Sequence, residues 1–297
     1  MKTLTSLEFF KTKLLKIILT LEKLLFSRSP TAVWVIISSL WIVIFFISGA
    51  NQRPPIGDEG DYLLRGIGLI EIGINTLADG YRPPLFPILI SLLYKFVGNE
   101  LLLNSTRLLN IALVSIVPAI WSFQYQRSDG ETKFAFMALL TALWAPFYMF
   151  AFSALAEAAS FLFLNLLLVS SLGLLKVKKL VGKLIFITAF LIACLFFLKA
   201  NNILVALPLG VFIFLFSNGN WLKKFWRVGL LTIFSAILVA SWPTFLYQKS
   251  GHLVATTTGG LNLLVGTGYY NFGMEEDYSA IHNIKKKELY NGVYPTL

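Results

Sequence analysis

Charged residues are scarce in this chain of 297 residues, where Asp, Glu, Lys and Arg together make up 13%. Soluble domains typically carry about 25%. Hydrophobic residues account for 57%, and the mean hydropathy is +0.73. A soluble α/β domain with an unusually apolar core is the alternative, but the composition favours an integral membrane protein.

Cysteine and histidine are nearly absent. Cys194 is the single cysteine, so no intramolecular disulfide can form, and its place inside an apolar run indicates inert packing. His252 and His282 are too few and too far apart to indicate a metal site. The net charge of +10 would suggest a nucleic-acid partner in a soluble protein. Here the basic residues lie mostly in short loops between apolar runs, where they orient the chain in a membrane, and we expect no nucleic-acid partner.

Long apolar runs are the main feature of the sequence. A membrane-spanning helix needs about 20 apolar residues, and these runs predict an all-α fold with about seven transmembrane helices. One further run, 84–97, has 14 residues and is short for a crossing. The predicted crossings are 32–50, 106–124, 134–152, 158–175, 184–198, 203–216 and 228–246.

The short loops 176–183 and 220–227 decide the expected orientation, because together they hold seven Lys and Arg residues. Both loops fall on the cytoplasmic side, as the positive-inside rule requires, if the N-terminus is cytoplasmic and the run 84–97 does not cross. We therefore predict that 84–97 is an interfacial helix. The expected parts, in a plasma membrane, are a basic amphipathic cytoplasmic helix at 1–31, a transmembrane module at 32–246 with its first outer loop at 51–105, and an extracytoplasmic segment at 247–297.

The segment 61–79 is expected to form an amphipathic helix in that outer loop. At 100° per residue its polar side chains fall within an arc of roughly 120°, which is typical of a helix lying at a membrane surface. An ordinary amphipathic helix packed on its neighbours is the alternative. The polar residues of this stripe are Asp61, Arg65, Glu71, Asn75 and Asp79.

This topology brings five charged residues from distant parts of the chain to one face of the membrane. Four of them have an ordinary explanation as well: the acidic pair in a solvated loop, and the basic residues as headgroup anchors. Glu157 has fewer such explanations, because no adjacent cation neutralises it. Together, however, cations that hold a phosphate and a carboxylate that acts as a base are the elements needed for sugar transfer from a lipid-linked phosphosugar. The phosphate leaves without a proton, so direct attack by a hydroxyl needs one base and inverts the anomeric carbon. The five residues are Asp58, Glu59, Arg82, Glu157 and Lys199.

The stretch DEGDYLLRGIGLI…DGYRPPLFPILISLLYKFVG, followed by TRLLNIALVSI, resembles the opening of the polyprenyl-phosphate-dependent membrane glycosyltransferases. These include protein O-mannosyltransferases and the bacterial transferases that add aminoarabinose to lipid A. FSALAEAASFLF and ACLFFLKANNILVALPL are similar to that family's later acidic and Lys-containing stretches. The resemblance covers about residues 32–273.

The resemblance implies the C-type fold of membrane glycosyltransferases, with a seven-helix module and an outward-facing site. Asp58 would be the catalytic carboxylate, next to Glu59, while Arg82 and Lys199 would contact the carrier phosphate and Glu157 would be a second acidic position. The donor would be an undecaprenyl or dolichyl phosphate sugar, and the acceptor a lipid, a glycan or a protein. A divalent cation, Mg²⁺ or Mn²⁺, is not required by all related enzymes; Glu59, Asp61 and Glu157 are the candidates to bind one.

Two further expectations follow from the whole chain. Relatives commonly continue through several more crossings, so a chain that stops at Leu297 is either a fragment or a minimal version of such an enzyme.

A transporter or flippase of lipid-linked sugars is the main rival function, and a membrane scaffold is a third. A transporter is expected to place charges at the bilayer midplane and to show paired repeats, whereas the charges here fall at predicted helix ends and no repeat is evident.

Overall fold

The structure is a computed structural model that describes residues 20, 29–128, 130–177 and 182–251. Every helix or strand assigned in those residues is a helix, which confirms the predicted all-α class. Most of the two predicted flanking segments, 1–31 and 247–297, lies outside the described residues.

Four helices in the described part of the chain are long and apolar enough to cross a membrane, as expected of a membrane protein. Three shorter apolar segments of 10–17 residues accompany them, so the number of seven crossings stays a prediction. The long helices are α2 (Pro30–Ile47), α4 (Leu85–Arg127), α7 (Glu157–Lys176) and α10 (Trp221–Ser250), and the shorter segments are α5 (Thr132–Leu143), α8 (Gly182–Leu198) and the 3₁₀ helix η3 (Ala200–Val205) with α9 (Ala206–Phe216).

The predicted crossing 134–152 is divided between two helices, α5 and α6 (Ala145–Ala151). Trp144, between them, has ψ of 87° and is not helical. Pro146 falls in the first turn of α6, where a proline is tolerated because its missing N–H would have no partner in the helix anyway. The prediction of one continuous helix over these 19 residues was therefore wrong, because Pro146 interrupts it.

The first outer loop also differs from the prediction at a glycine. The helix expected over 61–79 is α3 (Asp58–Glu71) followed by a short 3₁₀ helix, η2 (Ile74–Leu77). Gly73 lies between them with φ of 92°, a conformation that ends a helix and favours glycine. Gly98 has a similar effect inside α4, where its φ of 69° separates the short arm formed by the run 84–97 from the long helix that follows.

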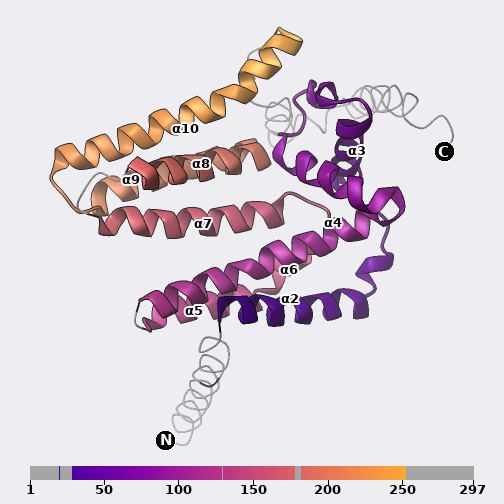
Figure 1. Ribbon diagram of the computed structural model, residues 1–297, viewed down its shortest axis with the longest axis horizontal. Coiled ribbons are helices and arrows are strands. Elements are labelled where there is room, and N and C mark those ends of the chain that lie inside the picture. The colour runs from indigo at the N-terminus through magenta and orange to yellow at the C-terminus, as the bar shows by residue number, and fades with distance from the viewer. Residues whose placement is uncertain (1–19, 21–28, 129, 178–181, 252–297) are drawn as a thin grey trace, which may run out of the picture.

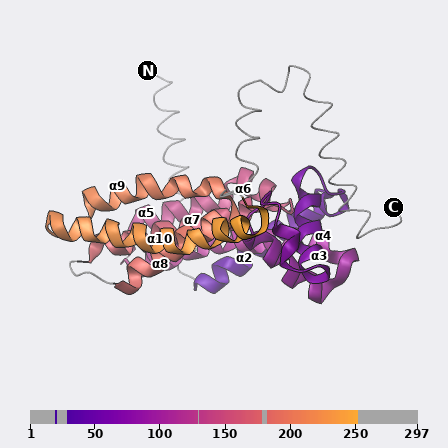
Figure 2. The same ribbon diagram turned by 90° about the horizontal axis from the view of Figure 1, so that it is seen from above.

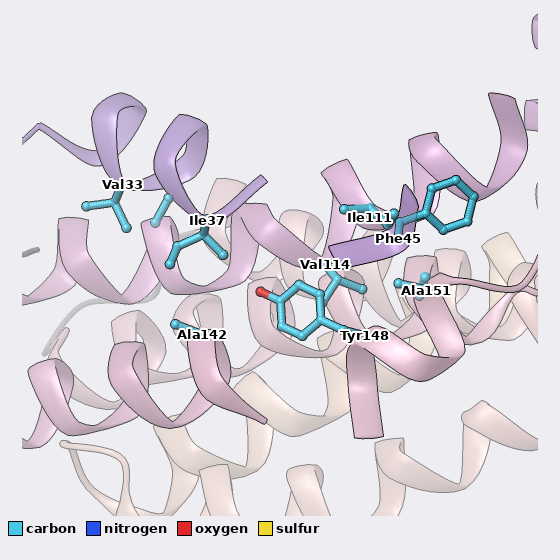
Figure 3. Packing of buried hydrophobic residues seen from close by; sticks show 10 residues of the cluster. Val33, Ile37, Phe45, Ile111, Val114, Ala142, Tyr148 and Ala151 are labelled. Atoms are coloured by element: carbon cyan, nitrogen blue, oxygen red, sulfur yellow. The ribbon is translucent and has the colours of Figure 1, made fainter. Parts of the chain in front are cut away.

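Small and branched side chains pack α2 against α4, α5 and α6. Figure 3 shows Phe45 of α2 beside Ile111 of α4, with Ile37 and Val33 further along α2. The same cluster includes Tyr148 of α6, whose ring stacks on Trp41 of α2 with 3.9 Å between centroids. This packing fixes α6, and with it the turn that leads into α7.

The helices run roughly parallel to one another, and their two ends differ in character (Figure 1). One end, which we call the acidic end, carries α3, the arm of α4, the start of α7 and the end of α8. Figure 2 also places α3 and the start of α4 at this end. The opposite end, which we call the basic end, carries the turns from α4 to α5, α7 to α8 and α9 to α10 (Figure 1). Its described basic residues are Arg127, Lys133, Lys176, Lys183, Lys223, Lys224 and Arg227.

Of the two segments predicted as cation-rich loops, 221–227 forms the first turns of α10 instead, and the described residues of 176–183 belong to the ends of α7 and α8. Both lie at the end of the molecule opposite α3. The turns within this basic end contact one another: the backbone N–H of Asn218 donates to the carbonyl of Leu175, and the Arg227 guanidinium donates to the carbonyls of Val177 and Asn218. Which end faces the cytoplasm stays a prediction.

A stability test follows from the close approach of α3 and α4. A Cβ at Gly66 would lie 2.3 Å from Cγ2 and 2.7 Å from Cβ of Ile90, so the two helices would have to move apart. Gly66→Ala is therefore expected to reduce the free energy of unfolding by about 1–3 kcal/mol, as overpacking does. Gly60→Ala is the matched control in the same helix, because nothing lies within 4 Å of its Cβ. Thermal unfolding of both variants in one detergent checks this, and equal midpoints would contradict the packing.

Candidate active site

Glu59, in the first turn of α3, is almost fully buried, with 1% of its side chain exposed. Its Oε1 accepts from the backbone N–H of Ala154 at 2.6 Å and from Arg53 Nη2 at 3.1 Å. Its Oε2 accepts from the backbone N–H of Ile56 at 2.8 Å and from Arg107 Nη2 at 3.0 Å. Burial by itself would raise the pKa of Glu59, but the hydrogen bonds from Arg107 and the two N–H groups outweigh it and hold the pKa below its ordinary value.

Arg107 of α4 has no exposed side-chain surface. Besides Glu59, it donates to the backbone carbonyls of Ala50, Arg53 and Pro54, at 3.0, 2.8 and 3.3 Å. The Glu59–Arg107 pair therefore joins the segment after α2, the start of α3, the middle of α4 and the turn before α7. A carboxylate enclosed in this way has no open side toward a substrate, so its surroundings favour a positioning role for Glu59 over the predicted catalytic one.

Asp58 directly precedes Glu59 but is open, with 56% of its side chain exposed. Its Oδ1 lies 2.5 Å from Nη2 of Arg82, which is itself buried. The Arg82 guanidinium lies over the rings of Tyr62 and Tyr81, at 4.9 and 4.7 Å from their centroids, and Arg82 Nε donates to Asp61 Oδ2 at 2.9 Å. Asp58 is thus an accessible carboxylate beside a cation whose position is fixed.

Arg82 keeps its charge in this environment. Burial by itself would lower its pKa, but Tyr62 and the carboxylates of Asp61 and Asp58 outweigh burial, so the pKa of Arg82 is raised. A guanidinium that is fixed by two carboxylates and lies near two aromatic rings has a defined position, which suits the binding of an oxyanion such as phosphate.

Asp61 connects Arg82 to a second arginine. Its Oδ1 accepts from Arg65 Nε at 3.1 Å, and the Arg65 guanidinium pairs with both oxygens of Asp79 at 2.8 and 2.7 Å. Arg65 is buried. Three members of the predicted polar stripe therefore pair with one another and with Arg82 instead of all facing water, which agrees with the alternative of a helix packed on its neighbours.

Glu157 and Lys199 form a second ion pair, at 2.6 Å between Oε1 and Nζ. Glu157 is the first residue of α7, and Lys199 directly follows α8. Both side chains are partly exposed, at 32% and 43%. The sequence predicts no neutralising neighbour for Glu157, and its partner is supplied from 42 residues further along the chain.

Tyr62 contacts Arg82 of the first ion pair and packs with the chain neighbours of the second. It belongs to the same buried cluster as Ala156, next to Glu157, and Leu198, next to Lys199. Burial, together with the carboxylates of Glu157, Asp58 and Asp61, raises the pKa of Tyr62, while Arg82 opposes this. The predicted site residues thus gather at the acidic end, although as two pairs: Asp58 with Arg82, and Glu157 with Lys199.

The candidate ligands for a divalent cation do not gather. In the described part of the chain, no group of three or more His, Cys, Asp or Glu residues is placed to hold a metal ion. Glu59, Asp61 and Glu157 each pair with a basic side chain instead. This donor set does not fit a bound Mg²⁺ or Mn²⁺.

No protein-family model, curated protein or solved structure matches the chain. The assignment of a function therefore depends on the geometry of the two ion pairs and on the residues that carry the resemblance.

Proposed function

We propose that the chain is a membrane glycosyltransferase that moves a sugar from a polyprenyl-phosphate carrier to an acceptor hydroxyl. The observation that carries this proposal is the Asp58–Arg82 pair, in which an exposed carboxylate lies 2.5 Å from a buried arginine at one end of an apolar helix bundle. A charged residue at the edge of a membrane is costly enough to suggest a function. Here a carboxylate that can act as a base lies beside a cation that can bind phosphate.

The chemistry needs few groups. Arg82 binds an oxygen of the carrier phosphate, and this contact replaces part of the contact between Arg82 and Asp58. Asp58 accepts the proton of the acceptor hydroxyl, whose oxygen attacks the anomeric carbon. The bond from that carbon to the phosphate oxygen breaks, and the polyprenyl phosphate leaves with the electron pair. One displacement inverts the configuration at the anomeric carbon.

The membrane placement belongs to the same proposal. We take the bundle as a module of about seven crossings with its acidic end outside the plasma membrane. The described Lys and Arg residues are divided evenly between the two ends, but those at the basic end lie in or beside short turns, to which the positive-inside rule applies, and this supports the orientation. Lipid, glycan and protein acceptors all carry the hydroxyl group that the reaction needs.

Lys199 supplies a second cation near Tyr62. Lys199→Ala is expected to weaken binding of a polyprenyl-phosphate sugar by roughly tenfold or more, because a hydrogen bond between charged groups is lost. Lys183→Ala is the control, since this exposed lysine lies at the basic end. Equilibrium binding of labelled donor to each variant in nanodiscs is the measurement. Equal affinity of wild type and Lys199→Ala would remove Lys199 from the phosphate site.

The proposed activity is tested by incubating membranes that contain the chain with a panel of labelled polyprenyl-phosphate sugars and identifying the labelled product. We expect label to leave the carrier and to appear in a glycosylated lipid, glycan or protein, and membranes without the chain provide the control. The rival transporter predicts that intact labelled donor moves across the membrane and that no new glycoside forms. That outcome would overturn the proposal.

A further inference from the structure

A chain of alternating charges begins at the start of α3 in the acidic end. From the exposed Asp58 it passes through Arg82, Asp61 and Arg65 to Asp79, and the successive members lie 2.5, 2.9, 3.1 and 2.7 Å apart. Both arginines are buried. Three carboxylates and two guanidinium groups give the cluster one net negative charge, although it contains the cation of the proposed phosphate site.

Asp61, in the middle of this chain, divides its two oxygens between the two arginines. Its Oδ2 accepts from Nε of Arg82 at 2.9 Å, and its Oδ1 accepts from Nε of Arg65 at 3.1 Å. Nη2 of Arg82 is thereby left to Asp58. A carboxylate with both oxygens available favours a bidentate pair, in which two N–H groups of one arginine bind the two oxygens.

Arg65 is held in the position from which it takes one oxygen of Asp61. Its guanidinium pairs with both oxygens of Asp79, at 2.8 and 2.7 Å. Nη1 of Arg65 also donates to the backbone carbonyl of Thr76 at 3.2 Å. Only 5% of the Arg65 side chain is exposed, so it acts on a ligand through its neighbours and not by direct contact.

We propose that Arg65 is a positioning residue for the phosphate site, because it withholds one oxygen of Asp61 from Arg82. Nη2 of Arg82 can then exchange Asp58 for the carrier phosphate. Without Arg65, Asp61 would bind Arg82 through both oxygens, and the phosphate would have to displace a bidentate ion pair. The cluster would also carry a second net negative charge, which repels an anion. This inference rests on the proposed function, since its ligand is the carrier phosphate.

Equilibrium binding of undecaprenyl phosphate and of dolichyl phosphate to the full chain in nanodiscs tests the inference. Arg65→Gln is expected to bind the better of these two lipids roughly tenfold or more weakly than the wild type. Lys95→Gln is the matched control, because it removes an exposed positive charge from the arm of α4 at the same end. Salt screens an exposed charge, so the affinity of this control should stay within about twofold of the wild type.

Asp61→Asn gives a result that does not depend on whether Arg65→Gln folds. The amide oxygen can still accept from Arg82, but it lacks the charge that competes with a phosphate, so this variant is expected to bind at least as tightly as the wild type. The double variant Asp61→Asn/Arg65→Gln should bind within about threefold of the wild type, because no carboxylate is left for Arg65 to withhold. If Arg65 only fastened α3 to its neighbours, Asp61→Asn would not restore binding.

The outcomes separate this inference from the proposed function. A wild type that binds neither lipid would overturn both. If the wild type binds, the inference alone is overturned by an unchanged affinity of Arg65→Gln, by an equal loss in Lys95→Gln, or by weaker binding of Asp61→Asn. A double variant that binds as weakly as Arg65→Gln would also overturn the inference alone.

Discussion

Replacement of Arg107 by methionine is expected to lower the free energy of unfolding by about 3–5 kcal/mol, because it leaves a buried carboxylate without its main partner. Glu59 and Arg107 expose 1% and 0% of their side chains, and water cannot replace the lost contacts. Three backbone carbonyls of the segment after α2 lose their donor as well. Thermal and denaturant unfolding in one detergent measure the effect.

Two comparisons separate this effect from general damage. Lys133→Met removes one member of the exposed Lys133–Glu131 pair and should leave the unfolding midpoint nearly unchanged. The double variant Glu59→Gln/Arg107→Met removes the buried charge together with its partner, so it should be more stable than Arg107→Met alone. A double variant as unstable as the single one would contradict the assignment of Glu59 as the buried charge that Arg107 stabilises.

The lowered pKa of Glu59 also gives this pair a pH dependence. A carboxyl group with a lowered pKa in the folded state stabilises the fold fully above its unfolded pKa, for which the ordinary value is 4.5. The contribution is lost as the pH falls further through the folded pKa. At pH values below about 4.5, the thermal unfolding midpoint of the wild type should therefore decrease as the pH is lowered. The decrease should be less steep in the double variant.

Asp58→Asn is expected to lower the rate of sugar transfer by about 10²–10⁴-fold, the usual contribution of a general base. The amide has nearly the same shape but cannot accept the proton of the acceptor hydroxyl. Since the side chain is 56% exposed, the variant should unfold at nearly the wild-type temperature. Single-turnover assays with purified protein and labelled donor provide the rate.

Glu71→Gln is the matched control for that experiment, because Glu71 is an exposed acid at the other end of the same helix and contacts Tyr94. It should retain wild-type transfer. Wild-type turnover by Asp58→Asn would exclude Asp58 as the base, whereas a failure of both variants to fold would point to a structural role for α3.

The general placement of the site could be predicted from the sequence. Apolar runs and loop charges show which segments share an end of the bundle, because a helix of known length in a membrane has few possible placements. Asp58 and Arg82, 24 residues apart in the chain, do meet there, and so do Glu157 and Lys199. Helix periodicity also places Asp61 and Arg65 on one face of α3.

The pairing within the site could not be predicted in the same way. Sequence spacing gives the face of a helix but not the depth of a side chain, so the burial of Glu59 and the exposure of adjacent Asp58 were not distinguished. Arg107 belongs to the stretch TRLLNIALVSI that carries the resemblance, but its partner Glu59 was not predicted, although a lone arginine in an apolar run needs a partner. The helix breaks at Gly73 and between α5 and α6 depend on single residues, Gly73 and Pro146, that an average over an apolar window hides.

The central claim is that the acidic end transfers a sugar from a polyprenyl phosphate by one displacement. It is tested most directly with purified wild-type protein in nanodiscs, a donor of known anomeric configuration, and magnetic resonance of the product. We predict a glycoside of the opposite configuration together with one free polyprenyl phosphate for each sugar transferred. A product that retains the donor's configuration, or donor that stays intact with lipid, glycan and protein acceptors alike, would contradict the claim.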